Sequence, residues 1–271
     1  MGTIKLLKQI GVEDKMDLKL NGKTAIVTGG ASGIGRQTCL DFAEEGVNVV
    51  IIDVNEEGAN EVVQEITEKG GNALAMKCDV TNTEDVKNAV QKTMDTFGRV
   101  DILICNAGIL RDNLIYKMSE EEYDIVMDVN LKGYWRFCRE IVPIMKIQKY
   151  GKIVMISSTA YKGNRGQSNY SPAKAGVVAL CKTIAQEVGY LGINCNCIAP
   201  GLVHTALTDY FVKDEKLREK VEEDLILVRQ PELGPKLGIP KDISNAILFF
   251  SSDVSSYITG EVLLIAAGRK M

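Results

Sequence analysis

The chain has 271 residues, and at about 150 residues per domain this length predicts one or two domains. Apolar residues make up 45% of the chain and charged residues 25%, which excludes a disordered or collagen-like protein. The net charge of −4 argues against a protein that binds nucleic acid through phosphate contacts. No apolar run approaches the roughly 20 residues of a membrane-spanning helix. We therefore expect no nucleic acid and no membrane among its partners, and a cytoplasmic location.

Cysteine and histidine content narrows the chemistry further. The chain has seven cysteines and one histidine, His204, and no CxxC pair. A structural zinc site needs about four Cys or His ligands at close spacing, so we expect no metal. Cys195 and Cys197 are interpreted as packing residues, and His204 as a polar loop residue. Residues 1–20 lack a long apolar core, which favours a surface extension over a secretory signal.

Apolar runs alternate with amphipathic stretches along the chain. The runs that predict buried strands are 24–28, 47–53, 73–78, 100–105, 152–156, 193–198 and 261–265. The stretches that predict helices are 33–46, 56–69, 83–97, 119–148, 169–190 and 241–251, with a charged amphipathic run at 213–223. Wholly apolar strands that each precede a helix predict an α/β fold, a doubly wound, mostly parallel seven-stranded sheet with helices on both faces. We expect one domain over 21–271, with a substrate lid at about 202–238.

The first predicted strand runs into a glycine-rich turn with the sequence TGGASGIG at 28–35. Gly29, Gly33 and Gly35 allow a tight turn, a close approach to a pyrophosphate and the start of a helix. The N-terminus of that helix offers free N–H groups to the phosphates. Alone, such a turn is only a weak sign of a dinucleotide site.

The second predicted strand ends at Asp53. An acidic side chain at this position accepts the ribose hydroxyl hydrogens of NAD and repels the 2′-phosphate of NADP. Ser32 and Val54 stand where a basic residue would bind that phosphate, and Arg36 is expected to face outward. The alternative interpretation of Asp53 is a turn residue, and the pattern favours NAD as the cofactor.

Tyr170 and Lys174 are four residues apart on a predicted helix, so their side chains share a face. A phenol has an ordinary pKa near 10, and an adjacent ammonium with a positive nicotinamide ring lowers that pKa. Ser157 and Ser158 end an apolar strand, where a hydroxyl can bind a substrate oxygen. Taken alone, a Tyr-x-x-x-Lys pair says little about function.

Further motifs follow in a fixed order. They are Asp79-Val80, Asn106-Ala107-Gly108, Asn130 in Val-Asn-Leu-Lys-Gly, Ser158, Tyr170-Ser-Pro-Ala-Lys174 and Pro200-Gly201. With TGGASGIG they resemble the short-chain dehydrogenase/reductase family over residues 20–268, nearly the whole chain. The resemblance implies that Tyr170 is the general acid/base and that Lys174 binds the nicotinamide ribose and lowers the tyrosine pKa. It implies that Ser158 bonds the substrate oxygen and that Asn130 holds a water of a proton relay.

The same resemblance implies a set of cofactor contacts and a quaternary structure. The contacts are Gly29, Ser32, Gly33, Ile34, Gly35, Asp53, Asp79, Val80, Asn106, Ala107, Gly108, Tyr170, Lys174, Pro200, Gly201, Val203 and Thr205. Because family members are mostly homotetramers or homodimers, we expect a homotetramer.

The chain departs from the family pattern at two places. Ser158 lies twelve residues before Tyr170, where the family usually shows thirteen, so counting from the tyrosine selects Ser157. Counting from the strand at 152–156 selects Ser158, which we favour. The chain ends its last strand with Ile265-Ala266-Ala267-Gly268, where many relatives have Asp-Gly-Gly, so the C-terminal contacts are expected to differ.

Three functions remain. The first is an NAD-dependent dehydrogenase or reductase for a secondary alcohol or ketone. The second is a 3-oxoacyl thioester reductase or 3-hydroxyacyl thioester dehydrogenase, normally NADPH-linked, although Asp53 and Ser32 count against NADPH. The third, a cofactor-binding sensor without turnover, is disfavoured because Ser158, Tyr170 and Lys174 are all present.

The substrate pocket is expected from 109–118, 159–168 and 202–230. Its apolar candidates are Ile109, Leu110, Leu114, Tyr161, Leu202, Leu207, Tyr210 and Phe211. The cations that could meet an acidic or coenzyme A tail are Arg111, Lys162, Arg165 and Lys213. Tyr134 and Trp135 are interpreted as core or subunit-contact residues.

Overall fold

The computed structural model describes residues 17–209, 213–227, 229–230 and 236–269. One sheet of parallel strands runs through them in the order β3-β2-β1-β4-β5-β6-β7. The strands are β1 (Thr24–Thr28), β2 (Asn48–Asp53), β3 (Ala73–Lys77), β4 (Ile102–Cys105), β5 (Gly151–Ile156), β6 (Ile193–Pro200) and β7 (Val262–Ile265). This confirms the predicted doubly wound seven-stranded sheet, in which every pairing is parallel.

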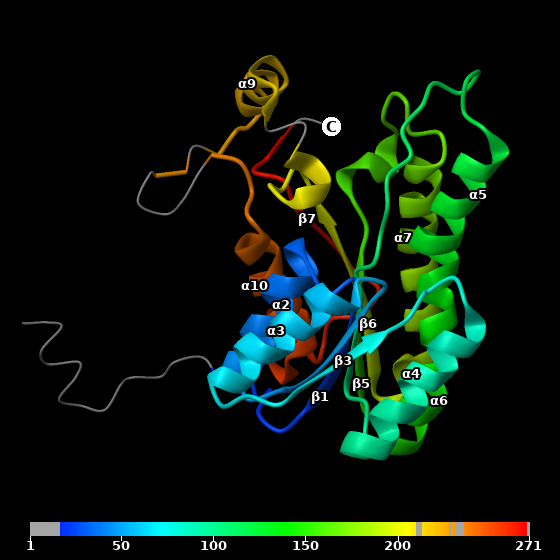
Figure 1. Ribbon diagram of the computed structural model, residues 1–271, viewed down its shortest axis with the longest axis vertical. Coiled ribbons are helices and arrows are strands. Elements are labelled where there is room, and N and C mark those ends of the chain that lie inside the picture. Colours follow the sequence, from blue (N-terminus) through cyan, green and yellow to red (C-terminus); the bar gives the residue numbers. More distant parts are fainter. Residues whose placement is uncertain (1–16, 210–212, 228, 231–235, 270–271) are drawn as a thin grey trace, which may run out of the picture.

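Helices cover both faces of the sheet (Figure 1). On one face lie α2 (Gly33–Glu44), α3 (Glu56–Glu68) and α10 (Pro240–Ser251). On the other lie α4 (Thr83–Phe97), α5 (Glu120–Met127), α6 (Gly133–Gln148) and α7 (Tyr170–Val188). The expected charged run forms α9 (Glu215–Glu223), which lies beyond the carboxyl ends of the strands.

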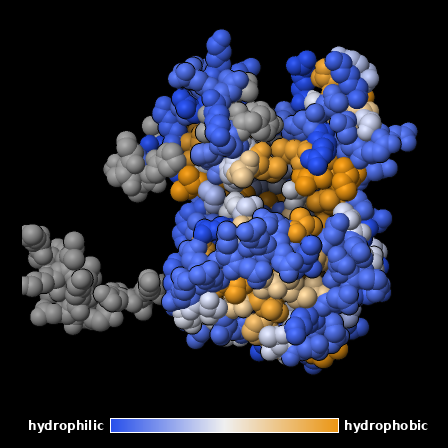
Figure 2. Space-filling model, in the orientation of Figure 1, coloured by the Kyte–Doolittle hydropathy of each residue, from blue (hydrophilic) through white to orange (hydrophobic). Residues whose placement is uncertain are grey.

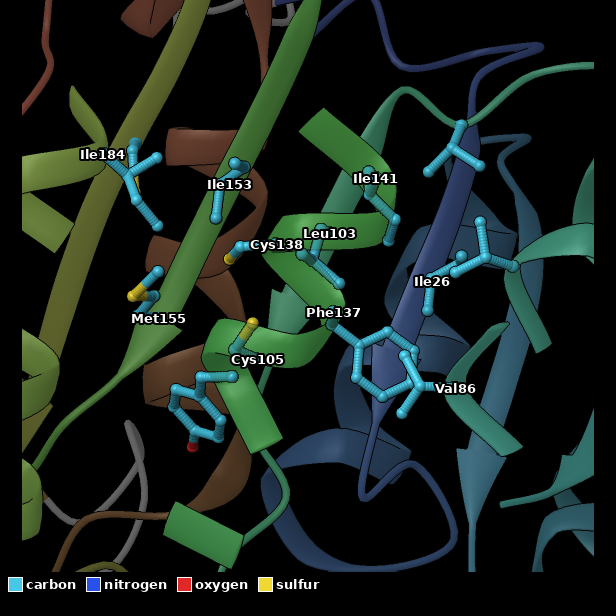
Figure 3. Packing of buried hydrophobic residues seen from close by; sticks show 14 of the residues in the cluster. Ile26, Val86, Leu103, Cys105, Phe137, Cys138, Ile141, Ile153, Met155 and Ile184 are labelled. Atoms are coloured by element: carbon cyan, nitrogen blue, oxygen red, sulfur yellow. The ribbon is translucent and has the colours of Figure 1, made fainter. Parts of the chain in front are cut away.

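Two buried clusters, one on each face of the sheet, make up the core. Successive strand residues alternate between them, so that Ile26 belongs to one cluster and Val27 to the other. Figure 3 shows Phe137 and Ile141 of α6 packed toward Leu103 of β4. All seven cysteines are buried and unpaired, including Cys195 and Cys197, and they act as small apolar packing groups.

The predicted helical stretch at 119–148 is interrupted. A π-helix, η1 (Asp128–Lys132), separates α5 from α6. A π turn takes one more residue than an α turn and changes the direction of the side chains that follow. Apolar spacing does not reveal this insertion, because the residues on both sides keep a helical period. The interruption carries Asn130 and leads directly into Tyr134.

The remaining differences from prediction lie at segment ends and outside the described residues. β6 continues to Pro200 because its pairing with β7 extends to Pro200 and Ile265. None of the described helices is long and apolar enough to span a membrane. Most of the expected N-terminal extension, together with Tyr210 and Phe211 of the expected lid, falls outside the described residues.

Candidate active site

The glycine-rich turn after β1 is shaped by close backbone contacts. A Cβ on Gly35 would lie 2.1 Å from the carbonyl oxygen of Gly29, and a Cβ on Gly29 would lie 2.8 Å from the Cα of Ala107. Gly33 adopts a φ of +54°, which disfavours any residue with a side chain. Ser32 occupies the N-cap of α2 but makes no side-chain cap hydrogen bond, so the first turn of α2 keeps free N–H donors.

Asn106 joins the glycine turn to the end of β4. Its amide nitrogen donates to the carbonyl oxygens of Thr28 and Gly29, both at 3.0 Å. The hydroxyl of Thr28 accepts hydrogen bonds from the backbone N–H groups of Asn106 and Ala107. These bonds hold the ends of the two neighbouring strands together at the carboxyl edge of the sheet.

Asp53 lies at this edge, at the end of β2. Its carboxylate accepts hydrogen bonds from the N–H of Ala31 and the N–H of Asn55, each at 3.0 Å. Arg36 is half exposed and pairs with Glu65 on α3, in line with the expectation that it faces outward. Among the described residues the Asp53 carboxylate is held in place by N–H donors and forms no ion pair.

Two cavities meet above the carboxyl edge. The first, of about 490 Å³, is called the Asp53 cavity; the second, of about 570 Å³, is called the Tyr170 cavity. Ile34, Asn106, Gly108, Thr205 and Leu207 line both, so the two form one cleft. The space-filling view shows a hollow bordered by apolar side chains on this side of the molecule (Figure 2).

The predicted cofactor residues are distributed between the two cavities. The Asp53 cavity is lined by Gly29, Ser32, Gly33, Ile34, Asp53, Asp79, Val80, Asn106, Ala107, Gly108 and Thr205. The Tyr170 cavity is lined by Ser158, Tyr170, Lys174, Pro200, Gly201 and Val203, besides the shared residues. Gly35 lines neither cavity, and it acts by making room inside the turn.

The structure distinguishes the two candidate serines by their contacts. The buried hydroxyl of Ser157 donates to the carbonyl oxygen of Lys174 at 2.8 Å and ties β5 to α7. The hydroxyl of Ser158 accepts from the N–H of Ala160 at 3.2 Å and lies within hydrogen-bonding reach of the Tyr170 phenol. Both serines line the Tyr170 cavity, but the hydroxyl of Ser157 is bonded within the fold, while that of Ser158 lies beside Tyr170.

Burial is the largest influence on the pKa values of Tyr170 and Lys174, which both lie on α7. It raises the pKa of Tyr170 to about 12, and the hydrogen bond from Ser158 opposes this shift. It lowers the pKa of Lys174 to about 8. The expectation that the ammonium and a nicotinamide ring together lower the tyrosine pKa stays a prediction. Within the protein, desolvation of the phenolate is the largest contribution to the pKa of Tyr170, and the Lys174 ammonium bonds other oxygens.

Those other oxygens are a backbone carbonyl and a second phenol. The ammonium of Lys174 donates to the carbonyl of Ile156 at 2.8 Å and to the hydroxyl of Tyr134 at 3.3 Å. Its Nζ lies 5.5 Å from the centre of the Tyr170 ring. The lysine is thereby held inside the wall of the Tyr170 cavity, next to the phenol that the sequence predicted as its partner.

Asn130 lies in the π-helix and is fully buried. Its amide nitrogen donates to the carbonyl oxygens of Ile109 and Val126, both at 3.0 Å. Among the described residues its Oδ1 has no hydrogen-bond partner, and a Cβ on Gly108 would approach it to 2.7 Å. This unpaired acceptor lies beside a residue that lines both cavities, although Asn130 itself lines neither.

The loop after β6 closes the cleft and is braced by the C-terminal turn. The N–H of Gly201 donates to the carbonyl of Ile265 at 2.8 Å, and a Cβ on Gly201 would lie 2.9 Å from the side chain of Ala266. Ala267 adopts a φ of +50°, a left-handed conformation that costs an alanine on the order of 1 kcal/mol. The carbonyl of Ala267 accepts the N–H groups of Ile226 and Leu227, so this departure from the family ending contacts the lid segment.

The other residues predicted to line the substrate pocket are distributed unevenly between the two cavities. Leu110, Leu202 and Leu207 line the Tyr170 cavity, Ile109 lines the Asp53 cavity, and Leu114 and Tyr161 line neither. Of the four predicted cations only Lys162 lines the Tyr170 cavity. His204 is half exposed and lies 3.4 Å from Asp209, as expected for a polar loop residue.

Sequence reasoning missed three residues of the site. Tyr134 is a core residue, as one of its two interpretations expected, and its hydroxyl also contacts Lys174; the available signal was its position four residues after Asn130. Lys220 of α9 and Arg269 near the C-terminus line the Tyr170 cavity. No local pattern marks either cation, because tertiary contacts alone bring them to the cleft.

The residues present fit a nicotinamide dinucleotide. The uncapped first turn of α2 offers N–H donors suited to phosphate, and the glycines leave the turn open to close approach. The carboxylate of Asp53 offers acceptors suited to ribose hydroxyls at the far side of the same cavity. The cleft then continues to Tyr170 and Lys174.

Comparisons with known proteins agree with this fit. The family model described as enoyl-(acyl carrier protein) reductase matches residues 29–270. A (2S)-[(R)-hydroxy(phenyl)methyl]succinyl-CoA dehydrogenase subunit, BbsD, from Thauera aromatica is 42% identical over 93% of this chain and 98% of its own. The 3-oxoacyl-[acyl-carrier-protein] reductase FabG of Thermotoga maritima is 41% identical over 93% and 99%. The crystal structure of gox2181 superposes with a TM-score of 0.87 at 33% identity, covering 93% of this chain and 97% of the other.

With this fold and these matches, the chain belongs to the short-chain dehydrogenase/reductase family. It is an oxidoreductase of the class that uses a nicotinamide cofactor. The resemblance derived from the ordered motifs is thereby confirmed.

Proposed function

We propose that this protein is an NAD-dependent oxidoreductase that interconverts 3-hydroxyacyl and 3-oxoacyl thioesters. The observation that carries the proposal is the Tyr170 cavity, where Ser158, Tyr170 and Lys174 lie together on a wall whose other ionisable residues are all cations. These cations are Lys162, Lys220 and Arg269, and no carboxylate lines this cavity among the described residues. Such a lining favours a substrate with an anionic tail.

The similar proteins favour the thioester alternative over a simple secondary alcohol. The name of the Thauera relative specifies a dehydrogenase of a coenzyme A thioester, and that of the Thermotoga relative a reductase of a carrier-protein thioester. Both tails bear phosphate groups. Lys162 and Lys220 are exposed and make no ion pair among the described residues, so they are available to such groups.

The Asp53 cavity supports NAD rather than NADP. Asp53 and Asp79 line it, and neither a lysine nor an arginine does so among the described residues. A 2′-phosphate would bring a second negative charge close to Asp53 without a cation to offset it. Arg36 on α2 is engaged by Glu65.

The side chains of the Tyr170 cavity supply the acid/base chemistry. In the oxidation, Tyr170 as phenolate takes the hydroxyl proton at C3 of the substrate, while Ser158 donates a hydrogen bond to the same oxygen. A nicotinamide held in the cleft would supply the acceptor for the hydride from C3. Lys174 stabilises the phenolate by its charge, and Asn130 holds a relay water at its free Oδ1. In the reduction, Tyr170 returns the proton to the carbonyl oxygen.

We further propose that residues 21–271 act as one catalytic domain, with 202–238 as a lid over the Tyr170 cavity. Leu202, Thr208, Lys220 and Val221 of this segment line the cavity, which supports the assignment. A lid of this kind would exclude water from the reacting atoms.

We also propose a homotetramer. Apolar side chains lie exposed on α6 and β7, including Ile147, which is 84% exposed, and Leu263, which is 40% exposed. Burial of these faces against further copies would remove apolar surface from water. Light scattering after size-exclusion chromatography tests this directly, and a monomer at working concentration would reject it.

The test of function is a spectrophotometric assay of NADH or NADPH formation. The purified protein is offered NAD or NADP with a 3-hydroxyacyl-CoA, its pantetheine thioester and a plain secondary alcohol of similar chain length. We expect NAD-dependent turnover of the coenzyme A thioester, with a higher KM for the pantetheine thioester. Turnover of the plain alcohol at equal or greater kcat/KM would overturn the thioester assignment, and faster turnover with NADP would overturn the cofactor assignment.

A further inference from the structure

Lys174 is buried, and its ammonium is bonded to two neighbouring oxygens. Its side chain is 3% exposed, and an ammonium has three N–H donors. Ile156 and Tyr134 accept two of them, at 2.8 Å and 3.3 Å. One donor is left for the cleft that Lys174 lines. These two partners are therefore the described groups that fix the position of the ammonium.

Tyr134 makes one of these two contacts with Lys174. It is fully buried, its hydroxyl donates to the same Ile156 carbonyl at 3.2 Å, and its ring centre lies 5.1 Å from Nζ of Lys174. Tyr134 lies in the first turn of α6, four residues after Asn130 of the preceding π-helix. Tyr134 thereby connects the helix that carries Asn130 to the lysine on α7.

The Ile156 carbonyl alone satisfies the Tyr134 hydroxyl as a hydrogen-bond donor. Tyr134 also offers its lone pair to the ammonium, which stabilises the charged form of a lysine that burial destabilises. The phenol itself stays neutral, because burial raises the pKa of Tyr134 well above its ordinary value. It is therefore a permanent acceptor at any pH where the protein would work.

We propose that Tyr134 is a positioning residue of the active site, whose hydroxyl holds the Lys174 ammonium in place and keeps it charged beside Tyr170. The inference rests on the proposed function only for its catalytic consequence. Its physical content, the coupling between one hydroxyl and one ammonium, holds for the protein without substrate. The sequence motifs of the family include Lys174 but not this second tyrosine.

Few other titratable groups face Lys174. They are Cys105 of β4, Cys197 of β6 and Tyr170 of α7. Burial raises the pKa of Cys105 well above its ordinary value and that of Cys197 to about 12, so both thiols stay neutral. Tyr170 likewise has a raised pKa. The lysine is thus the group of this set that titrates nearest to neutral pH.

The experiment is an NMR titration of lysine side chains labelled with ¹³C at Cε, in the full-length protein without cofactor. The Lys174 resonance is assigned by its absence in Lys174→Met. In Tyr134→Phe, which keeps the ring and removes the hydroxyl, we expect the pKa of Lys174 to fall by about one unit, since the charged form loses one hydrogen bond. The matched control is Tyr150→Phe, which removes a hydroxyl bonded to Asp253 away from the site.

Tyr134→Phe should also move the pH dependence of catalysis to lower pH. A lower lysine pKa means that Lys174 loses its charge at lower pH, so the alkaline limb of the kcat/KM profile should move down by about one pH unit. An unchanged Lys174 titration in a folded Tyr134→Phe protein overturns the proposal, as does an equal shift in Tyr150→Phe. If the titration shifts but wild-type protein turns over no thioester, the proposed function fails and the coupling stands.

Discussion

The two cavities share a wall but differ in charge. The Asp53 cavity is lined by two aspartates and no cation, whereas the Tyr170 cavity is lined by cations and no carboxylate among the described residues. The ligands of the proposed function, a dinucleotide and a coenzyme A thioester, both carry phosphates, and the protein offers a different set of donors to each. It offers backbone N–H groups of α2 in the first cavity and side-chain cations in the second.

The difference reflects how each cavity is built. The Asp53 cavity is formed by strand ends and a glycine turn that Asn106 holds together through backbone hydrogen bonds. The Tyr170 cavity draws on α7, the loop after β6, α9 and the C-terminal turn. A rigid site made of backbone suits an invariant ligand, and a site made of side chains from distant segments can be adapted to one substrate.

The largest effect on turnover should come from replacing Tyr170, the proposed acid/base residue in the Tyr170 cavity. Tyr170→Phe should lower kcat by about 1000-fold, because it removes the acid/base group and keeps the ring. Cofactor affinity, measured by fluorescence titration, should change by less than about threefold. Turnover within tenfold of wild type would remove Tyr170 from the acid/base role.

Ser157 and Ser158 both line the Tyr170 cavity, and their variants test which hydroxyl bonds the substrate oxygen. Ser158→Ala should lower kcat by about 100-fold and leave the free energy of unfolding nearly unchanged. Ser157→Ala should do the opposite: it should lose about 1 kcal/mol of stability in urea unfolding, since the Lys174 carbonyl loses a donor. Reversed results would assign the catalytic role to Ser157.

Asp53→Asn tests the charge of the first cavity. It removes the negative charge and keeps an acceptor for only one of the two N–H groups, those of Ala31 and Asn55, because each bonds a different carboxylate oxygen. The ratio of kcat/KM for NAD to that for NADP should fall by about tenfold, mostly through improved use of NADP. Glu57→Gln, an equal charge change at an exposed position on α3, is the control. The same ratio in Asp53→Asn and wild type would show that Asp53 does not discriminate.

The smallest effect is expected from the cations of the second cavity. Replacing Lys162 and Lys220 together by glutamine should raise KM for a coenzyme A thioester about fivefold at low salt, and less at high salt, because exposed charges are screened. A plain ketone substrate should be unaffected. Lys92→Gln on α4 provides the control for a general loss of positive charge. An equal rise in KM for the ketone would contradict a tail-binding role.

Local patterns predicted most of the fold and the Asp53 side of the cleft. Apolar runs predicted the strands, and the glycine turn and Asp53 lie next to those runs in sequence, so their positions followed from strand order. The π-helix was not predicted, because inserting one residue leaves helical periodicity on both sides intact. The raised pKa of Tyr170 was not predicted either, since desolvation depends on what covers the phenol after folding.

The sequence by itself determined the fold, the family and the identity of the tyrosine–lysine pair. These depend on residue types at fixed spacing, which is local information. Only the tertiary structure gave Ser157 and Ser158 different hydrogen-bond partners, brought Lys220 and Arg269 to the cleft and placed the hydroxyl of Tyr134 against Lys174. Each of these depends on which atoms meet across distant segments, and that is decided by packing rather than by spacing along the chain.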